Sequence, residues 1–364
     1  MLEIKKRRRA KIVEVFVSTA VAIVLGFLVG GLLLRISGYN AMGAYAVMFG
    51  KVINDFGLVV GKATPLIFTG LAIAIPYSIG LVNLGAEGQM LVGAFAAAMV
   101  GSYIHVPAFI HVPLVILAGA LAGTMFSTFC GFLKLRFKAN EVVTTVMLNS
   151  VVSLLAQYCV NGPLNGEPSQ PQTKMIDETA YLSKFSVRDE YSTAIFIAIA
   201  VAIIIWVFMN KTVLGYEMRA VGLNMKASLY KGIRVEQISL LAMSLGGLIA
   251  GIGGSCEVMG LQHNYYQGFV QNYGYTGIGV ALIARNNPLA VIPAAFFLAI
   301  IRVGGIAIGR QTPIPSYFIW VLQGVIIVTL AIPNIMEHLK QTAYAIIRFF
   351  EHLQNKGEKK CKNS

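Results

Sequence analysis

Apolar segments long enough to cross a membrane recur along almost the whole chain. A hydrocarbon core about 30 Å thick is crossed by about 20 mostly apolar helical residues. Backbone amides inside lipid have no water to bind, so the available spanning structures are helices and closed barrels. The long apolar segments therefore predict an all-α integral membrane protein. The composition agrees, because only 12% of the 364 residues are charged, against about 25% in soluble domains.

The hydropathy pattern predicts about ten transmembrane helices in a single polytopic domain, residues 13–333. The segment 270–284 is short for a full crossing and is crowded with glycine, so we expect a short or re-entrant path there. The segment 58–80 is also irregular, because it carries Lys62, Pro65 and Pro76. We expect the spans near residues 13–34, 58–80, 85–103, 109–132, 141–160, 192–210, 237–258, 270–284, 288–307 and 315–333.

The basic residues predict an orientation. A formal charge of +13 would suggest a nucleic-acid partner for a soluble protein, but cytoplasmic loops of membrane proteins are enriched in Lys and Arg. With both termini in the cytoplasm, most of the 29 Lys and Arg fall on that side. We therefore expect a multi-pass protein of the cytoplasmic membrane, in contact with the lipid bilayer and without a nucleic-acid partner. Its parts are a basic cytoplasmic N-terminus (1–12), an external loop (161–191), a cytoplasmic loop (211–236) and a cytoplasmic tail (334–364) with an amphipathic helix.

Residues that commonly carry enzyme chemistry are scattered in this sequence. The four cysteines show no metal-ligand spacing, and the five histidines form no H-E-x-x-H motif. A P-loop requires G-x-x-x-x-G-K-[ST], and the nearest approach, residues 57–64, has the wrong spacing and lies in an apolar segment. We expect no catalytic residue, no metal and no cofactor. If ATP drives this protein, a separate subunit must hydrolyse it.

The cytoplasmic loop 211–236 is the most informative stretch. Short helical material, residues 217–220 and 225–230, is separated by the flexible residues 222–224, and a glycine-rich span follows. A loop with small residues, charges and a sharp turn suits docking into a groove on a soluble partner. The alternative is a basic inside loop of the kind that any polytopic protein has.

This stretch resembles the coupling region of ABC importer permeases of the branched-chain amino acid, ribose and nucleoside type. Their pattern is T-x-x-G-x-x-x-R-A-x-G-x-N, then G-I, then a small-residue helix ending in A-G-x-x-G. It is matched by Thr212, Gly215, Arg219, Ala220, Gly222, Asn224, Gly232, Ile233, Ala250, Gly251 and Gly254. The chain departs from the pattern at residues 226–228, where Lys-Ala-Ser replaces the paired alanines that are common in the family. The resemblance implies that coupling to an ATPase involves Gly215, Arg219, Ala220, Gly222, Asn224 and Gly232.

Three further stretches extend the resemblance over nearly the whole chain. Residues 83–95 match the start of the third span of these permeases, and residues 273–291 match their short segment. Residues 140–164 are most similar to the nucleoside branch. The resemblance implies a permease subunit of an ATP-driven importer for nucleosides, with a simple sugar such as ribose as the alternative substrate. The implied partners are an ABC ATPase subunit, a second related permease and an extracytoplasmic substrate-binding lipoprotein.

Candidate pathway residues follow from the chemistry of a nucleoside, which has a flat base and a hydroxyl-rich sugar. Aromatic faces and amides suit such a ligand better than fixed charges do. For the acidic residue at a predicted helix start, helix capping is the structural alternative, and Tyr is enriched at membrane interfaces in any case. The candidates are Glu87, Gln89, Asn149, Tyr273 and Tyr275, with Tyr265, Tyr266 and Phe269 in the same outer aromatic cluster.

An ion-coupled secondary transporter is the alternative from a different functional class. Such a carrier is expected to hold a carboxylate or a cation site at the centre of the membrane. Glu257, near the outer end of its predicted span, is a poor substitute for such a site. A separate question concerns Gly247 and Gly251, whose helical spacing permits packing inside the chain or contact with a second permease.

Overall fold

The computed structural model describes residues 24–167, 169–185, 191–270, 272–315 and 318–331. Regular structure within these residues is helical, and six of their helices are long and apolar enough to cross a membrane. These six are Phe56–Tyr77, Ala108–Phe137, Glu141–Asn161, Ala194–Lys211, Val235–Gln262 and Pro288–Gln311. The result agrees with an all-α membrane protein. The basic N-terminus (1–12), the start of the first expected span and the tail (334–364) lie outside the described residues.

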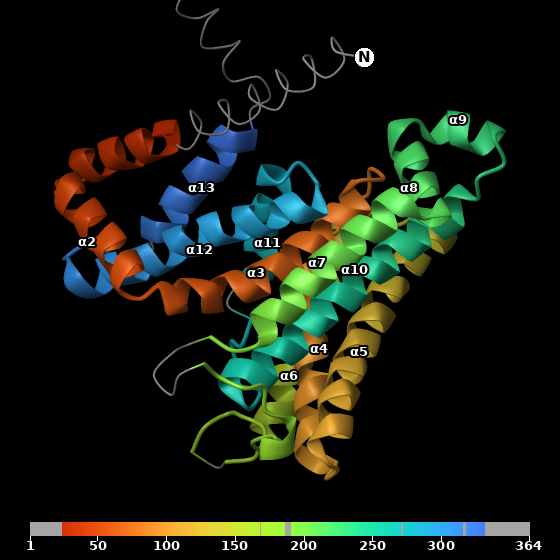
Figure 1. The fold of residues 1–364 in the computed structure, drawn as a ribbon, viewed down its shortest axis with the longest axis horizontal. Coiled ribbons are helices and arrows are strands. Elements are labelled where there is room, and N and C mark those ends of the chain that lie inside the picture. Colours follow the sequence, from red (N-terminus) through yellow and green to blue (C-terminus); the bar gives the residue numbers. More distant parts are fainter. Residues whose placement is uncertain (1–23, 168, 186–190, 271, 316–317, 332–364) are drawn as a thin grey trace, which may run out of the picture. The chain divides into compact units, whose positions relative to one another are not determined.

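The chain divides into two compact units. The smaller unit comprises residues 1–42 and 317–364, and its described helices are Val24–Ile36 and α13 (Phe318–Ala331). The larger unit comprises residues 43–316. Figure 1 shows its helices, which are α2 (Ala41–Asn54, from Gly43 on), α3 (Phe56–Tyr77), α4 (Ala86–Tyr103), α5 (Ala108–Phe137), α6 (Glu141–Asn161), α7 (Ala194–Lys211), α8 (Val213–Leu223), α9 (Met225–Tyr230), α10 (Val235–Glu257), α11 (Tyr273–Ile283) and α12 (Pro288–Gln311).

Helices α3, α4, α5 and α10 form the core of the larger unit. Where α10 crosses α5, a Cβ on Gly247 would lie 2.3 Å from the carbonyl oxygen of Gly123. A Cβ on Gly251 would lie 2.1 Å from the carbonyl oxygen of Gly119. Glycine is the residue that allows two helix backbones to approach so closely. Gly247 and Gly251 therefore serve packing inside the chain.

Helix α4 begins in the interior of the larger unit. After α3 ends at Tyr77, a short segment without helix turns back toward the start of α4. The Asn83 side chain in this segment donates to the carbonyl oxygen of Ala72 at 3.1 Å and lies beside Gly246, halfway along the 23-residue α10. At 1.5 Å per residue α10 is about 34 Å long. The start of α4 is therefore deep inside the helical bundle.

Helix α11 begins beside the start of α4. A Cβ on Gly274 would lie 2.2 Å from the backbone nitrogen of Glu87, so the two helix starts are in direct contact. Helix α11 has 11 residues and is about 16 Å long at 1.5 Å per residue. This length confirms the expectation that the segment 270–284 is short. Broken helices inside membrane proteins are found where the freed backbone groups are buried in protein or line a cavity.

Two helices differ from the sequence expectations. Helix α2 lies where we expected a connection between the first two spans. Its buried residues, Ala44, Met48 and Val52, recur at intervals of four, so this stretch forms a short amphipathic helix. Helix α8 runs without a break through Gly222, where we expected a flexible separation. The break comes at Asn224 instead, because the side chain of Asn224 caps the next helix.

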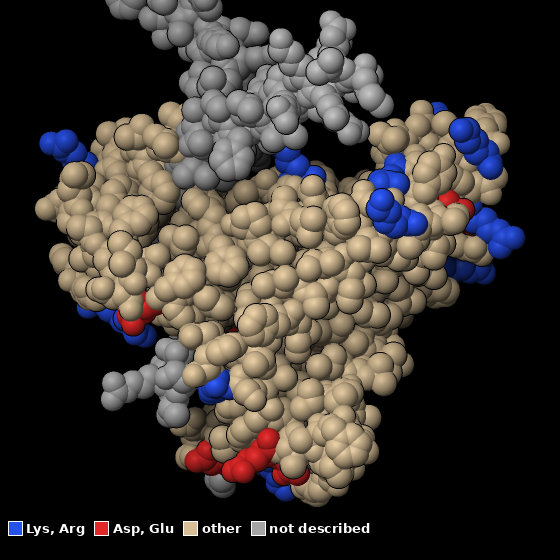
Figure 2. Space-filling model, viewed as in Figure 1, with Lys and Arg blue, Asp and Glu red and all other residues tan. Residues whose placement is uncertain are grey.

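The described residues between α6 and α7, 162–167, 169–185 and 191–193, include several that bind the adjoining helix ends. The backbone N–H of Asp177 donates to the carbonyl oxygen of Gly101, and that of Thr173 donates to Tyr265, both at 2.8 Å. Gln172 forms an isolated β-bridge with Tyr266. Figure 2 shows that Asp and Glu gather at this end of the larger unit, whereas Lys and Arg gather at the opposite end, over α8 and α9.

Candidate functional site

The starts of α4 and α11 face a pocket of about 650 Å³ in the larger unit. Its lining comes from helices α4, α6 and α11, from the segment 265–270 and from Asn272. Its volume lies within the range of about 300–1,000 Å³ that is typical of small-molecule sites. The lining residues that the structure describes include no Lys and no Arg, and Glu87 supplies the one carboxylate among them. Within the described residues, no cluster of His, Cys, Asp and Glu could hold a metal ion.

Helix α6 presents a polar stripe to this pocket. Asn149, Ser153 and Gln157 follow one another at intervals of four residues, so they lie along one side of the helix, and all three line the pocket. Hydroxyls and amides both donate and accept hydrogen bonds. This side of the pocket can therefore bind a neutral ligand that carries several hydroxyl or amide groups.

An aromatic cluster from the segment 265–272 lines the same pocket. Tyr265 and Phe269 are stacked with their ring centroids 5.4 Å apart, and both are almost completely buried. Burial raises the pKa of Tyr265, which keeps its hydroxyl neutral. Tyr275 from α11 also lines the pocket, with 41% of its surface exposed. Because Tyr275 has exposed surface beside this buried pair, a flat, uncharged ring can stack on it.

Three amide side chains hold the start of α4 in place. Asn149 donates to the carbonyl oxygen of Leu84 at 2.9 Å and accepts from the backbone N–H of Gly88 at 3.1 Å. Asn83 and Gln89 exchange two side-chain hydrogen bonds, at 2.9 and 3.1 Å, and both are fully buried. Since these polar groups are buried, each bond removes a desolvation penalty that an unpaired amide would carry.

Glu87 caps the neighbouring helix. Its carboxylate accepts the backbone N–H groups of Asn272 at 2.9 Å and Gly274 at 2.6 Å, at the start of α11. The positive end of a helix dipole favours a carboxylate in this position. The guanidinium of Arg302, on α12, lies 4.2 Å from the ring centroid of Tyr273, the first residue of α11. The start of α11 is thus tied to both α4 and α12.

The structure divides the predicted pathway residues into two groups. Glu87, Asn149 and Tyr275 line the pocket, whereas Gln89 and Tyr273 are buried in the contacts that hold α4 and α11. Sequence reasoning missed Ser153 and Gln157. The signal that could have found them is their spacing of four and eight residues from Asn149 on one helix. The outer aromatic cluster contributes Tyr265 and Phe269 to the same pocket.

The predicted coupling residues lie on an arm formed by α8, α9 and the turn after α9, which holds Gly232. Thr212 accepts the N–H of Gly215 at 3.1 Å and begins α8, and Asn224 accepts the N–H of Ala227 at 3.0 Å and begins α9. Side-chain caps of this kind satisfy the free N–H groups of a helix start. A Cβ on Gly222 would lie only 2.0 Å from the carbonyl oxygen of Ser78. The arm therefore rests directly on the end of α3.

The other coupling candidates shape the same arm. A Cβ on Gly215 would lie 2.3 Å from the carbonyl oxygen of Phe208, and Gly232 has a φ of +82°, which glycine tolerates best. Arg219 donates to the side chain of Asn210 at 2.9 Å, and the carbonyl oxygen of Ala220 accepts the N–H of Asn224 at 3.1 Å. Large apolar side chains are exposed on the arm, namely Val213, Tyr216, Leu223, Met225, Leu229 and Tyr230.

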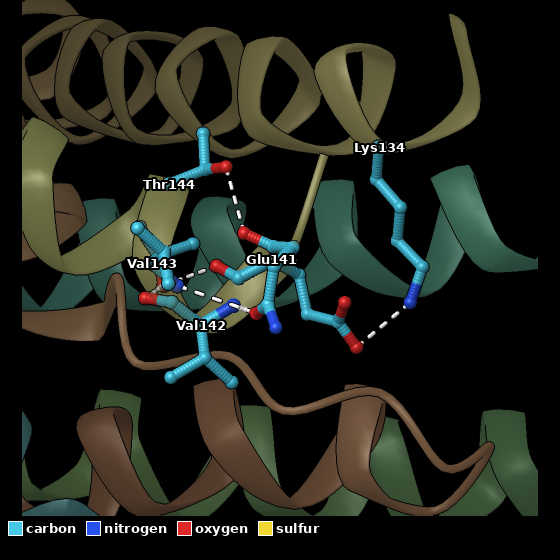
Figure 3. A network of polar contacts seen from close by, with 7 residues as sticks. Lys134, Glu141, Val142, Val143 and Thr144 are labelled. Carbon is cyan, nitrogen blue, oxygen red and sulfur yellow. Dashed lines mark hydrogen bonds and ion pairs between the residues drawn. The ribbon is translucent and has the colours of Figure 1, made fainter. Parts of the chain in front are cut away.

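The turn between α5 and α6 is fixed by polar contacts (Figure 3). Lys134 on α5 forms an ion pair of 2.7 Å with Glu141 at the start of α6. The side chain of Asn140 accepts the N–H groups of Val142 at 2.9 Å and Val143 at 3.4 Å, which caps α6. These contacts set the direction in which α6 leaves the turn and so the side on which its polar stripe lies.

Known proteins resemble this chain over most of its length. The guanosine ABC transporter permease protein NupP of Bacillus subtilis is 32% identical over 93% of this chain and 96% of its own length. The nucleoside ABC transporter permease protein NupB of Lactococcus lactis is 30% identical over 93% of this chain and 96% of its own. The glucose ABC transporter permease protein TsgB13 of Haloferax volcanii is 30% identical over 90% of both chains.

A family model covers the helices that build the pocket and the arm. Residues 56–330 match the family described as the branched-chain amino acid transport system permease component. The matched region runs from the start of α3 almost to the end of α13. It includes the apolar helices of a multi-pass membrane protein. The chain belongs to this family of transport-system permeases.

Proposed function

We propose that this chain is a membrane subunit of an ATP-driven importer that takes up nucleosides through the pocket between α4, α6 and α11. The observation that carries the proposal is the pairing of the polar stripe of α6 with the aromatic cluster across one pocket, whose described lining residues include no Lys or Arg. A nucleoside is neutral and has one flat, stackable face and several hydroxyls. Stacking and neutral hydrogen bonds are the interactions that this lining offers.

The names of the relatives support the same substrate class. Two of the three relatives described above are named for guanosine or nucleosides, and the third is named for glucose. All three are named as ABC transporter permeases, so an ATPase subunit and a substrate-binding protein are the expected partners. A second, related permease completes the assembly that we propose.

The α8–α9 arm is the proposed contact with the ATPase. Its exposed apolar side chains and the Lys and Arg around them suit a groove with an apolar floor and acidic edges. We place the arm in the cytoplasm, together with both termini, in a protein of about ten spans in the cytoplasmic membrane. This orientation follows the excess of Lys and Arg over the arm.

Replacing Ser153 with leucine is expected to lower the maximal rate of guanosine uptake by about tenfold, which corresponds to the loss of one hydrogen bond. The substitution removes a hydroxyl from the polar stripe and narrows the pocket. The measurement is uptake of labelled guanosine by cells that carry the complete transporter, at a saturating substrate concentration. Excess unlabelled nucleosides should compete with this uptake, and ribose and glucose should not.

The matched control is Val151→Leu, on the same helix at an exposed position that does not line the pocket. Its uptake should equal that of the unmodified transporter. Equal rates for Ser153→Leu and Val151→Leu would exclude the pocket as the substrate site. Competition by ribose or glucose with no effect of nucleosides would favour a sugar permease instead.

A further inference from the structure

A second pocket, of about 450 Å³, lies at the loop end of the larger unit. The segment after α6 supplies Gln170 and Gln172, and the segment after α10 supplies Gln262, Asn264 and Gln267. Five amide side chains thus surround one cavity, with Pro171 and Tyr266 completing the lining. We refer to it below as the amide pocket.

Hydrogen bonds hold the two walls of the amide pocket together. Asn264 donates to the side-chain oxygen of Gln172 at 2.8 Å, and the backbone N–H of Gln267 donates to the carbonyl oxygen of Pro171 at 3.2 Å. Gln172 and Tyr266 form a β-bridge between the same two segments. The walls are therefore joined at several points, and the cavity between them is a built feature of this end of the protein.

The chemistry of the amide pocket selects neutral ligands. A primary amide offers two N–H donors and one carbonyl acceptor and carries no charge at any physiological pH. Among the described residues, the lining includes no Lys, Arg, Asp or Glu. The nearby carboxylate of Glu167 accepts a hydrogen bond from the Gln172 side chain, and it would repel a phosphate group. A ligand with several hydroxyl or ring-nitrogen groups fits this lining, and a nucleotide does not.

The amide pocket adjoins the pocket between α4, α6 and α11. Gln267 lines both cavities, so a ligand that leaves one meets a residue of the other. The aromatic neighbours Tyr265 and Phe269, two residues on either side, line the deeper cavity, and Tyr266 lines the amide pocket. A single segment, residues 265–269, thus forms the boundary between an amide-lined cavity and an aromatic-lined one.

We propose that the amide pocket is an outer subsite, which binds a neutral nucleoside before it passes Gln267 into the deeper pocket. The inference rests on the proposed function, because it assumes that the deeper pocket is the substrate site. It adds a binding step on the loop side, with Gln170, Gln172, Gln262 and Asn264 as its hydrogen-bonding groups. A lining made mostly of amides can exchange hydrogen bonds with the sugar hydroxyls and with any base, which suits a site of passage.

The test uses cysteine protection in the complete transporter, reconstituted without ATP. Gln170→Cys and Gln262→Cys are placed singly in a chain whose Cys159 and Cys361 are replaced by serine, since Cys130 and Cys256 are buried. A membrane-impermeant maleimide is the reagent, and adenosine and adenosine monophosphate are the ligands. Adenosine at about four times its Kd should slow labelling of both positions about fivefold by mass action. Adenosine monophosphate should not slow it.

Two further positions make the result decisive. Met175→Cys, in the same loop but outside both cavities, controls for general changes in reagent access. Its labelling rate should be the same with adenosine, with adenosine monophosphate and without ligand. Ser153→Cys reports on the deeper pocket. Protection of Ser153→Cys without protection of Gln170→Cys and Gln262→Cys would overturn the outer subsite and leave the proposed function standing. Equal slowing by adenosine and its monophosphate would also overturn it. If adenosine slows labelling at none of these positions and the transporter takes up no nucleoside, both proposals are wrong.

Discussion

Replacing Gly222 with valine is expected to lower ATP-driven uptake by about a hundredfold, since overpacking costs about 1–3 kcal/mol and about 1.4 kcal/mol changes a rate tenfold. The added Cβ would lie 2.0 Å from the carbonyl oxygen of Ser78, and a backbone oxygen cannot move aside as a flexible side chain can. The α8–α9 arm must then lift away from the end of α3. Nucleotide hydrolysis by the assembled transporter should continue, but it should no longer drive uptake.

The matched control for this result is Gly50→Val. Gly50 also lies inside a helix, α2, but a Cβ there meets nothing within 4 Å. Both variants make the same change in helix propensity, so the difference between them isolates the contact with Ser78. Uptake and ATPase rates should be measured on the same preparations, after normalising to the amount of permease that co-purifies with the ATPase. Equal uptake by the two variants would show that the arm does not act through the end of α3.

Replacing Glu87 with alanine is expected to destabilise the start of α11 and to abolish uptake. The change leaves the N–H groups of Asn272 and Gly274 without the carboxylate that they donate to, and the loss of a helix cap costs about 0.5–2 kcal/mol. Thermal unfolding of the purified transporter and guanosine uptake are the two measurements.

A graded series separates the capping role of Glu87 from a direct role in binding. Glu87→Gln keeps a side-chain acceptor for one of the two amides, so its unfolding temperature should fall between those of the unmodified protein and Glu87→Ala. Glu178→Ala removes an exposed carboxylate from the loop and should leave the unfolding temperature unchanged. An unfolding temperature for Glu87→Ala equal to that of Glu178→Ala would show that the carboxylate does not support α11.

The sequence was sufficient to predict the class of fold and the location of the arm. Long apolar segments are local signals, and so are Thr212 and Asn224, which begin α8 and α9 by capping them. The role of Gly222 is different. A glycine between two short helical stretches suggested a flexible break. In the structure the helix continues through it, and the close approach of Ser78, from a distant part of the chain, explains why glycine lies there. Long-range backbone contacts of this kind have no signature in the local sequence.

The pocket could be predicted only in part, again because contacts between distant parts of the chain decide which side chains line it. The amides of Gln89 and Asn149 have the chemistry of substrate ligands, but Gln89 pairs with Asn83 and Asn149 holds the start of α4. A sequence cannot distinguish an amide that binds its own backbone from one that faces a cavity. Ser153 and Gln157 were overlooked because serine and glutamine are common in helices, and their shared side of α6 matters only once the pocket is known.

The most direct test of the account is guanosine uptake by proteoliposomes that contain this chain, its partner permease and the ATPase, with the substrate-binding protein outside and ATP inside. We predict uptake that requires ATP and all of these components, and that persists when ionophores collapse every ion gradient. Uptake by this chain alone, driven by an ion gradient without ATP, would contradict the account and would indicate an ion-coupled carrier.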